Sequence, residues 1–250
     1  MHDKRPVLIL QHQQPERPAY LSTWLNQHHI DHVTVNAGAG ESFPTSMEHY
    51  SALAVMGGGM SANDDLISNR QAEILILQAM RLDRPVIGHC LGGQLMTRAL
   101  GGTVHPSPQP EIGWQPIDWH DHELTSHWFG NQPTPRVIQW HYEAFSVPAG
   151  ATALASSSAC ATQAWALGPH LAMQFHIEID CVKAQQWAQD DDEKWCQARE
   201  LHSTVQGSTD ILAGIHTWLA QHQATAQHVY STWIGHSQWA WALPSRLDKY

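Results

Sequence analysis

Cysteine is scarce in this sequence, with four residues among 250, and no two of them form a C-x-x-C pair. Neither a disulfide framework nor a cysteine-rich zinc site is therefore expected. Cysteines that are few and unpaired fit a reducing compartment, so we expect a cytoplasmic protein. The four positions are Cys90, Cys160, Cys181 and Cys196.

Basic residues and long apolar runs are also lacking. The chain has 13 Lys and Arg against 23 Asp and Glu, which gives a formal net charge of -10 at pH 7. This charge provides no electrostatic attraction for nucleic acid or an anionic membrane, so neither is an expected partner. The apolar run at 7–10 is too short for a signal peptide. No run approaches the ~20 residues of a transmembrane helix, so we expect a soluble globular protein.

Metal-ligand spacing is absent as well. The 19 histidines include His120 and His122, with His127 nearby, but none has the spacing of a known metal site. Solvated histidines are the ordinary interpretation in a chain so rich in them. We expect no metal and no cofactor.

What the sequence does contain is an alternation of strand and helix signals. Short apolar runs at 7–10, 52–56 and 85–87 are typical of strands buried on both faces. Runs with helical spacing follow Pro18 and span 69–82. This alternation predicts an α/β fold, a three-layer sandwich with a mostly parallel central sheet, whose site lies at the carboxyl ends of the strands.

The second half of the chain changes character twice. Between 106 and 168, prolines and short strand signals predict a small β-rich insert. After Glu178 the signals are helical, and six of the 12 Trp lie beyond position 180. These Trp dock the helices on the core or form a partner or dimer surface. The predicted helices are 181–189, one starting at the acidic residues 190–193, and 209–221. We expect a domain over 1–180 and a helical C-terminal extension over 181–250 packed on the same domain.

The segment 88–92, Gly-His-Cys-Leu-Gly, has the G-x-nucleophile-x-G pattern of a nucleophile elbow. A strand, a tight turn and a helix in direct succession would hold Cys90 exposed above the sheet. The helix dipole there favours the thiolate, and the amide of Leu91 is free to donate to an oxyanion. Gln94 lies one helical turn beyond Cys90 on the same face, where it can contact the substrate.

Two further segments complete the expected site. His176 and Glu178 follow a strand signal, and residues two apart on a strand share a face, so the carboxylate can reach the imidazole. Together with Cys90 they supply nucleophile, base and orienting group. The buried strand at 52–56 runs into three glycines at 57–59, and no G-K-[ST] follows, so this is not a phosphate loop.

These segments resemble one enzyme family. Residues 88–94 are similar to the G-x-C-L-G-x-Q signature of class I (triad) glutamine amidotransferases, and residues 174–178 to their Q-F-H-P-E, with Ile177 in place of Pro. Redox-sensitive cysteine hydrolases share the elbow but typically place His straight after the Cys, where this chain has Leu91.

The β-rich segment narrows the resemblance. Residues 111–114 and 140–145 resemble the E-I-G-W and W-H-x-D/E-x-F segments of stand-alone amidotransferases related to the amidotransferase domain of GMP synthase. Tyr142 and Glu143 stand where Gly-Asp is commoner, which bears on how this segment contacts substrate.

The resemblance implies hydrolysis of the side-chain amide of glutamine through a γ-glutamyl thioester on Cys90, with His176 and Glu178 completing the triad. It also implies that an amide of Gly58 or Gly59 is the second oxyanion donor, without choosing between them. Too few residues follow Glu178 for a synthetase domain, so we expect either that a separate synthetase subunit receives the ammonia or that there is no ammonia acceptor.

Two alternatives remain open. A γ-glutamyl peptide hydrolase would use the same chemistry with an amine or amino acid as leaving group. A non-catalytic binding protein on the same fold would need none of it, although the intact Cys90, His176 and Glu178 set argues against this. A homo-oligomer is compatible with the sequence, which does not define the oligomeric state.

Overall fold

The computed structural model describes residues 5–14, 16–130, 136–189 and 192–235. Within them an eight-stranded sheet has the order β2-β1-β3-β4-β10-β9-β8-β6, and β5 pairs with β7 apart from it. The first five strands run parallel and the last three antiparallel. The strands of the large sheet are β1 Val7–Gln11, β2 His32–Asn36, β3 Ala52–Val55, β4 Val86–His89, β6 Asp118–Trp119, β8 Thr152–Ser156, β9 Ala164–Leu167 and β10 His170–Met173. The predicted α/β class with a mostly parallel sheet is confirmed.

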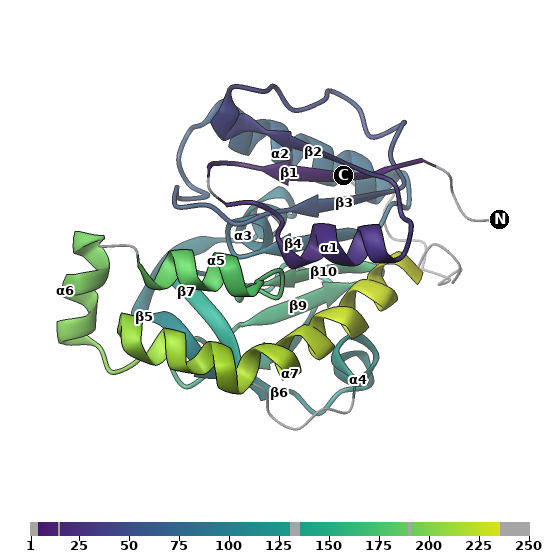
Figure 1. Cartoon of the computed structure of the whole chain (residues 1–250). Coiled ribbons are helices and arrows are strands. Elements are labelled where there is room, and N and C mark those ends of the chain that lie inside the picture. Colours follow the sequence, from purple (N-terminus) through teal and green to yellow (C-terminus); the bar gives the residue numbers. More distant parts are fainter. Residues whose placement is uncertain (1–4, 15, 131–135, 190–191, 236–250) are drawn as a thin grey trace.

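Helices cover both faces of this sheet, which makes the three predicted layers. Figure 1 shows α1 and α7 in front of the sheet and α2 behind it. Residues of β1 alternate between the two faces: Val7 and Ile9 pack into one core, Leu8 and Leu10 into the other. Because both faces are buried at this strand, its residues 7–10 are all apolar. The helices before the elbow and the one directly after it are α1 Tyr20–Gln27, α2 Ile67–Arg81 and α3 Leu91–Ala99, with a short 3₁₀ turn at Ala37–Ala39.

The predicted β-rich insert is divided between two sheets. Its long strands β5 (Val104–Pro116) and β7 (Arg136–Phe145) form the separate ribbon, whereas β6, β8 and β9 extend the central sheet. The helix α4 (Glu123–Phe129) lies where short strands and turns were predicted. It forms because the side chain of His122 accepts a hydrogen bond from the amide of Leu124, and because Trp128 and Phe129 are buried in the core.

Three helices end the described chain: α5 Cys181–Ala188, α6 Glu193–Leu201 and α7 Ser208–Gly235. The last one runs past the predicted end at 221, because Ala226, Val229, Tyr230 and Trp233 continue its apolar face into the core beneath the sheet. Asp192 caps α6. Residues 190 and 191 of the predicted acidic helix start lie outside the described residues, as does the part of the predicted extension from 236 to 250.

The tryptophans of the C-terminal segment are mostly inside the protein. Trp187, Trp195 and Trp233 are buried, and Trp218 is partly buried, while Trp239 and Trp241 lie outside the described residues. Of the helices that the structure describes, none has the length and apolar character needed to cross a bilayer.

Candidate active site

The elbow has the backbone conformation that the glycine pattern predicts. Cys90 lies between β4 and α3 with φ 49° and ψ -107°, a region that L-residues rarely adopt. Its amide donates a hydrogen bond of 2.8 Å to the carbonyl of Met173 on β10. Conformational strain of this kind occurs where it positions a functional group. Cys90 lines a pocket but is only 6% exposed, so it is less accessible than predicted.

The flanking glycines are required by close packing of α3 on the sheet. A Cβ at Gly92 would overlap the carbonyl oxygen of Val55 on β3, and one at Gly88 would lie 2.6 Å from the carbonyl carbon of Gly92. Only glycine permits backbone to approach backbone this closely. The two glycines therefore let the helix begin directly beneath Cys90.

His176 and Glu178 are in contact, as their spacing predicts. The Nδ1 atom of His176 lies 2.7 Å from Oε1 of Glu178, and the two residues are 2% and 0% exposed. The expected extended strand does not carry them, because β10 ends at Met173 and residues 174 and 175 bend. The chain bends so that the amide of His176 can donate to the carbonyl of Ile138 on β7 at 3.1 Å.

The charges of this pair are strongly coupled. Burial alone would lower the pKa of His176, but the negative charge of Glu178, the neighbouring Cys90 side chain and the hydrogen bond with Glu178 raise that pKa to about 10. Burial alone would raise the pKa of Glu178, yet the positive charges of Lys183 and His176 hold that pKa well below its usual 4.5. At neutral pH the pair is an imidazolium held by a carboxylate.

One pocket brings most of the predicted site together at the carboxyl ends of the parallel strands. Cys90, Gln94 and His176 line it, and among the described residues the Nε2 atom of His176 has no hydrogen-bond partner. Leu91 is the first residue of α3, so its amide has no hydrogen-bond partner within the helix. Its side chain lies in the core. The other lining residues are Gln13, Glu16, Gly58, Gly59, Met60, Trp140, His141, Tyr142, Glu143, Trp187, Asp192 and Lys194.

The two candidate glycines of the 57–59 loop differ in one respect. The amide of Gly59 donates to Oε1 of Gln13 at 3.1 Å. Gly57 packs directly against His176, since a Cβ there would lie 2.8 Å from Cε1 of that ring. Gly58 lies between them and lines the pocket with Cys90.

Gln94 holds the pocket wall together. Its Nε2 atom donates to the carbonyl of Glu143 at 3.4 Å and to Oε1 of Gln174 at 3.5 Å. Gln174 in turn donates to the sulfur of Cys90 at 3.6 Å. Gln174 is the first residue of the segment that carries His176 and Glu178, so its position beside Cys90 could have been predicted from the sequence.

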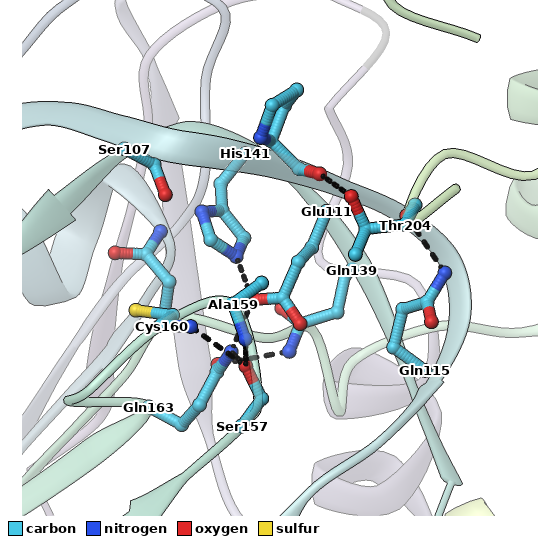
Figure 2. A network of polar contacts seen from close by, with 12 residues as sticks. Ser107, Glu111, Gln115, Gln139, His141, Ser157, Ala159, Cys160, Gln163 and Thr204 are labelled. Atoms are coloured by element: carbon cyan, nitrogen blue, oxygen red, sulfur yellow. Dashed lines mark hydrogen bonds and ion pairs between the residues drawn. The ribbon is translucent and has the colours of Figure 1, made fainter. Parts of the chain in front are cut away.

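Behind the pocket lies a buried polar network that sequence reasoning did not identify. Figure 2 shows Glu111 between the imidazole of His141 and the side-chain amide of Gln163, at 3.1 and 2.6 Å from its carboxylate. The other ring nitrogen of His141 lies 3.1 Å from the carbonyl of Glu143. The network thus supports the 140–143 segment. Glu111 lies in the segment 111–114 and His141 in the segment 140–145. The resemblance of these two segments to stand-alone amidotransferases was the sequence signal that could have indicated the network.

Sequence reasoning also missed Lys183, which lies on α5. It is 1% exposed, and its Nζ atom lies 3.1 Å from Oε1 of Glu178. The signal was a lysine on the buried helix face that also carries Ala184 and Trp187.

The histidines considered for a metal have other partners. The ring of His120 contacts the carbonyl of Ala153 and the hydroxyl of Ser156, and His122 caps α4. No cluster of three or more His, Cys, Asp or Glu side chains suited to a metal ion occurs in the part of the chain that the structure describes.

Comparison with known proteins agrees with this geometry. A sequence profile described as glutamine amidotransferase class-I matches residues 25–188. The glutamine amidotransferase-like protein YfeJ of Salmonella typhimurium is 36% identical over 151 residues, which span 56% of this chain and 62% of that protein. One subunit of the glutamine-hydrolysing GMP synthase of Ignicoccus hospitalis is 31% identical over 131 residues, which span 50% of this chain and 65% of its own length. Each match thus spans less than two thirds of the relative's length.

Solved structures extend the similarity over nearly the whole chain. The crystal structure of a glutamine amido transferase from Methylobacillus flagellatus is 35% identical with a TM-score of 0.89, covering 93% of this chain and 95% of that one. A glutamine amidotransferase from Thermotoga maritima, 21% identical with a TM-score of 0.81 over 93% of this chain and 99% of its own, has the same fold. From the profile match and the structural match at 35% identity, we conclude that the chain belongs to the class-I glutamine amidotransferase family.

Proposed function

We propose that this protein hydrolyses the side-chain amide of glutamine through a γ-glutamyl thioester on Cys90. The Cys90 thiol gives its proton to His176 before the attack. The resulting thiolate attacks the amide carbon, and the imidazolium of His176 gives the proton to the departing ammonia as the carbon–nitrogen bond breaks. Water then attacks the thioester, His176 accepts a proton from it, and glutamate leaves as the thiol is restored. Glu178 holds the imidazole with Nε2 towards the sulfur.

One observation carries this proposal. Nδ1 of His176 is held by Glu178 at 2.7 Å, while Nε2, without a hydrogen-bond partner among the described residues, belongs to the same pocket as the strained Cys90. A base oriented on one nitrogen and available on the other, beside a nucleophile at a helix start, is the arrangement that acyl transfer requires.

The oxyanion donors we propose are the amides of Leu91 and Gly58. Gly59 is the weaker candidate because its amide already donates to Gln13. The Leu91 amide follows the nucleophile directly and is without a partner inside α3. Each such donor contributes on the order of 10²–10³ in rate at comparable sites.

Gln94 is expected to position substrate without taking part in proton transfer. Gln94→Ala should lower kcat/KM for glutamine by about five- to tenfold, since one uncharged hydrogen bond contributes on the order of 1 kcal/mol. Cys90 in this variant should react normally with iodoacetamide, which makes no use of the pocket. Unchanged kcat/KM together with earlier melting would mean instead that Gln94 only seats the helix.

The leaving group separates glutamine hydrolysis from the γ-glutamyl peptide hydrolase alternative. We expect ammonia release from glutamine to exceed amine release from γ-glutamyl dipeptides in kcat/KM when purified protein is given each substrate. Faster cleavage of a dipeptide would make the protein a γ-glutamyl peptide hydrolase. Turnover of neither substrate class would favour the non-catalytic binding protein.

The ammonia acceptor we propose is a separate synthetase subunit. Support comes from the similarity to the GMP synthase chain of Ignicoccus hospitalis, which by its name is one subunit of a larger enzyme. We place the reaction in the cytoplasm, where a nucleophilic thiol stays reduced.

A further inference from the structure

Lys183 is a charged side chain enclosed in the protein beside the catalytic pair. It is 1% exposed, and its Nζ atom lies 2.9 Å from Glu16, 3.1 Å from Glu178 and 3.2 Å from the carbonyl of Arg17. The contacts with Glu178 and with the carbonyl of Arg17 are hydrogen bonds, and the contact with Glu16 is an ion pair. A buried ammonium is unfavourable unless it is paired in this way, so the position is built for a charge.

Lys183 and His176 share one oxygen atom. Nζ of Lys183 and Nδ1 of His176 both contact Oε1 of Glu178, at 3.1 and 2.7 Å. Within the described residues, Oε2 of Glu178 has no hydrogen-bond partner. The negative charge of one buried carboxylate is therefore divided between two cations. Without the ammonium, the whole charge would face the imidazole and hold its proton more tightly.

We propose that Lys183 is a positioning residue of the catalytic unit: it fixes the Glu178 carboxylate against His176 and offsets part of its charge. This inference rests on the proposed function, for which His176 must both take a proton from the thiol and release it to ammonia. A base that holds its proton too tightly performs the second step poorly.

The other groups around the carboxylate are neutral at neutral pH. Burial lowers the pKa of His89 on β4 and of His222 on α7 to about 4. Burial also raises the pKa of Tyr230 on α7, whose hydroxyl lies 3.4 Å from the ring of His89. In the described part of the chain, these three residues therefore leave the charge of Glu178 to be balanced by His176 and Lys183.

The charges on the other side of Lys183 are also paired. Glu16, which lines the pocket, takes the second contact of the ammonium and accepts a hydrogen bond from the indole of Trp187 at 2.9 Å. Arg17 pairs with Asp180 at 2.9 Å, and Asp180 caps α5 by accepting from the amide of Lys183. Burial alone would lower the pKa of Lys183, but Glu178 and Glu16 raise it, so the side chain stays charged.

The test is the pH dependence of Cys90 alkylation by iodoacetamide in the full-length protein, followed on the peptide that carries Cys90. This readout does not require glutamine turnover, so it tests Lys183 even if the proposed reaction is wrong. Removing a nearby positive charge favours the protonated form of every neighbouring group. Lys183→Met should therefore move the alkylation midpoint to higher pH by about one unit. If glutamine is turned over, both limbs of the kcat/KM profile should move in the same direction.

Arg17→Met is the matched control, because it removes a positive charge beside the same helix without touching Glu178. Its midpoint should equal that of the wild type. Lys183→Met leaves Glu16 and Glu178 without their shared cation. Should it fail to fold, the double variant Lys183→Met/Glu16→Gln removes one of these two charges and is compared with Glu16→Gln alone. An unchanged midpoint in the folded variant would overturn the proposal.

Discussion

Cys90→Ala is expected to abolish glutamine hydrolysis, with kcat falling by at least about 10⁴-fold. The reason is that the thioester cannot form, and the oxyanion donors that remain can only assist direct attack by water. Ammonia and glutamate release are the measurements. A glutamine-like electrophile should modify the wild type on the peptide that carries Cys90 and leave the alanine variant unmodified.

The other three thiols provide the controls for this experiment. Burial raises the pKa of Cys160 to about 11, although a hydrogen bond between its side chain and the backbone of Thr162 acts to lower that pKa. Cys181 is exposed at the start of α5 and outside the pocket lining, and Cys196 is half-buried. Cys181→Ala should therefore retain both activity and labelling. Modification chiefly at these three thiols, with Cys90 untouched, would contradict the elbow assignment.

His176→Ala and Glu178→Ala are expected to act on one unit, with the histidine change the more severe. Loss of the base should lower kcat/KM by on the order of 10⁴-fold, because proton transfer to and from the sulfur and the leaving group is lost. Loss of Glu178 leaves a base that is present but poorly oriented. The double variant should be little slower than His176→Ala alone, since residues of one relay have non-additive effects.

Glu178→Gln refines this prediction, because it keeps the shape of the side chain and removes its charge. It should behave like Glu178→Ala if charge matters more than contact at this position. All variants are compared at a temperature where melting curves show them folded. Losses that multiply in the double variant would mean that His176 and Glu178 act independently.

The backbone setting of Cys90 could be predicted because the signals are local. The glycines at 88 and 92 determine how closely α3 approaches β3, and a strand followed at once by a helix places Cys90 at the turn. The parallel sheet was equally predictable, since strands buried on both faces are apolar throughout. The His176–Glu178 contact was predicted correctly, although a bend and not a strand carries it.

What could not be predicted depends on contacts between distant segments. The difference between Gly58 and Gly59 on which our proposal rests comes from Gln13 in the first loop, whose side chain accepts a hydrogen bond from the amide of Gly59. The carboxylate of Glu178 meets Lys183 only because α5 packs its buried face towards the site. The length of α7 depends on the core into which Tyr230 and Trp233 pack. That core is formed by residues from distant segments, so the local sequence pattern does not predict it.

The γ-glutamyl thioester on Cys90 is tested most directly by adding hydroxylamine to the enzyme during glutamine turnover. Hydroxylamine competes with water for a thioester, so γ-glutamyl hydroxamate should form at the expense of glutamate while ammonia release does not fall. Cys90→Ala should give neither product. Continued release of glutamate with no hydroxamate, at hydroxylamine concentrations that do not inhibit ammonia release, would show that water attacks glutamine directly and that no acyl-enzyme forms.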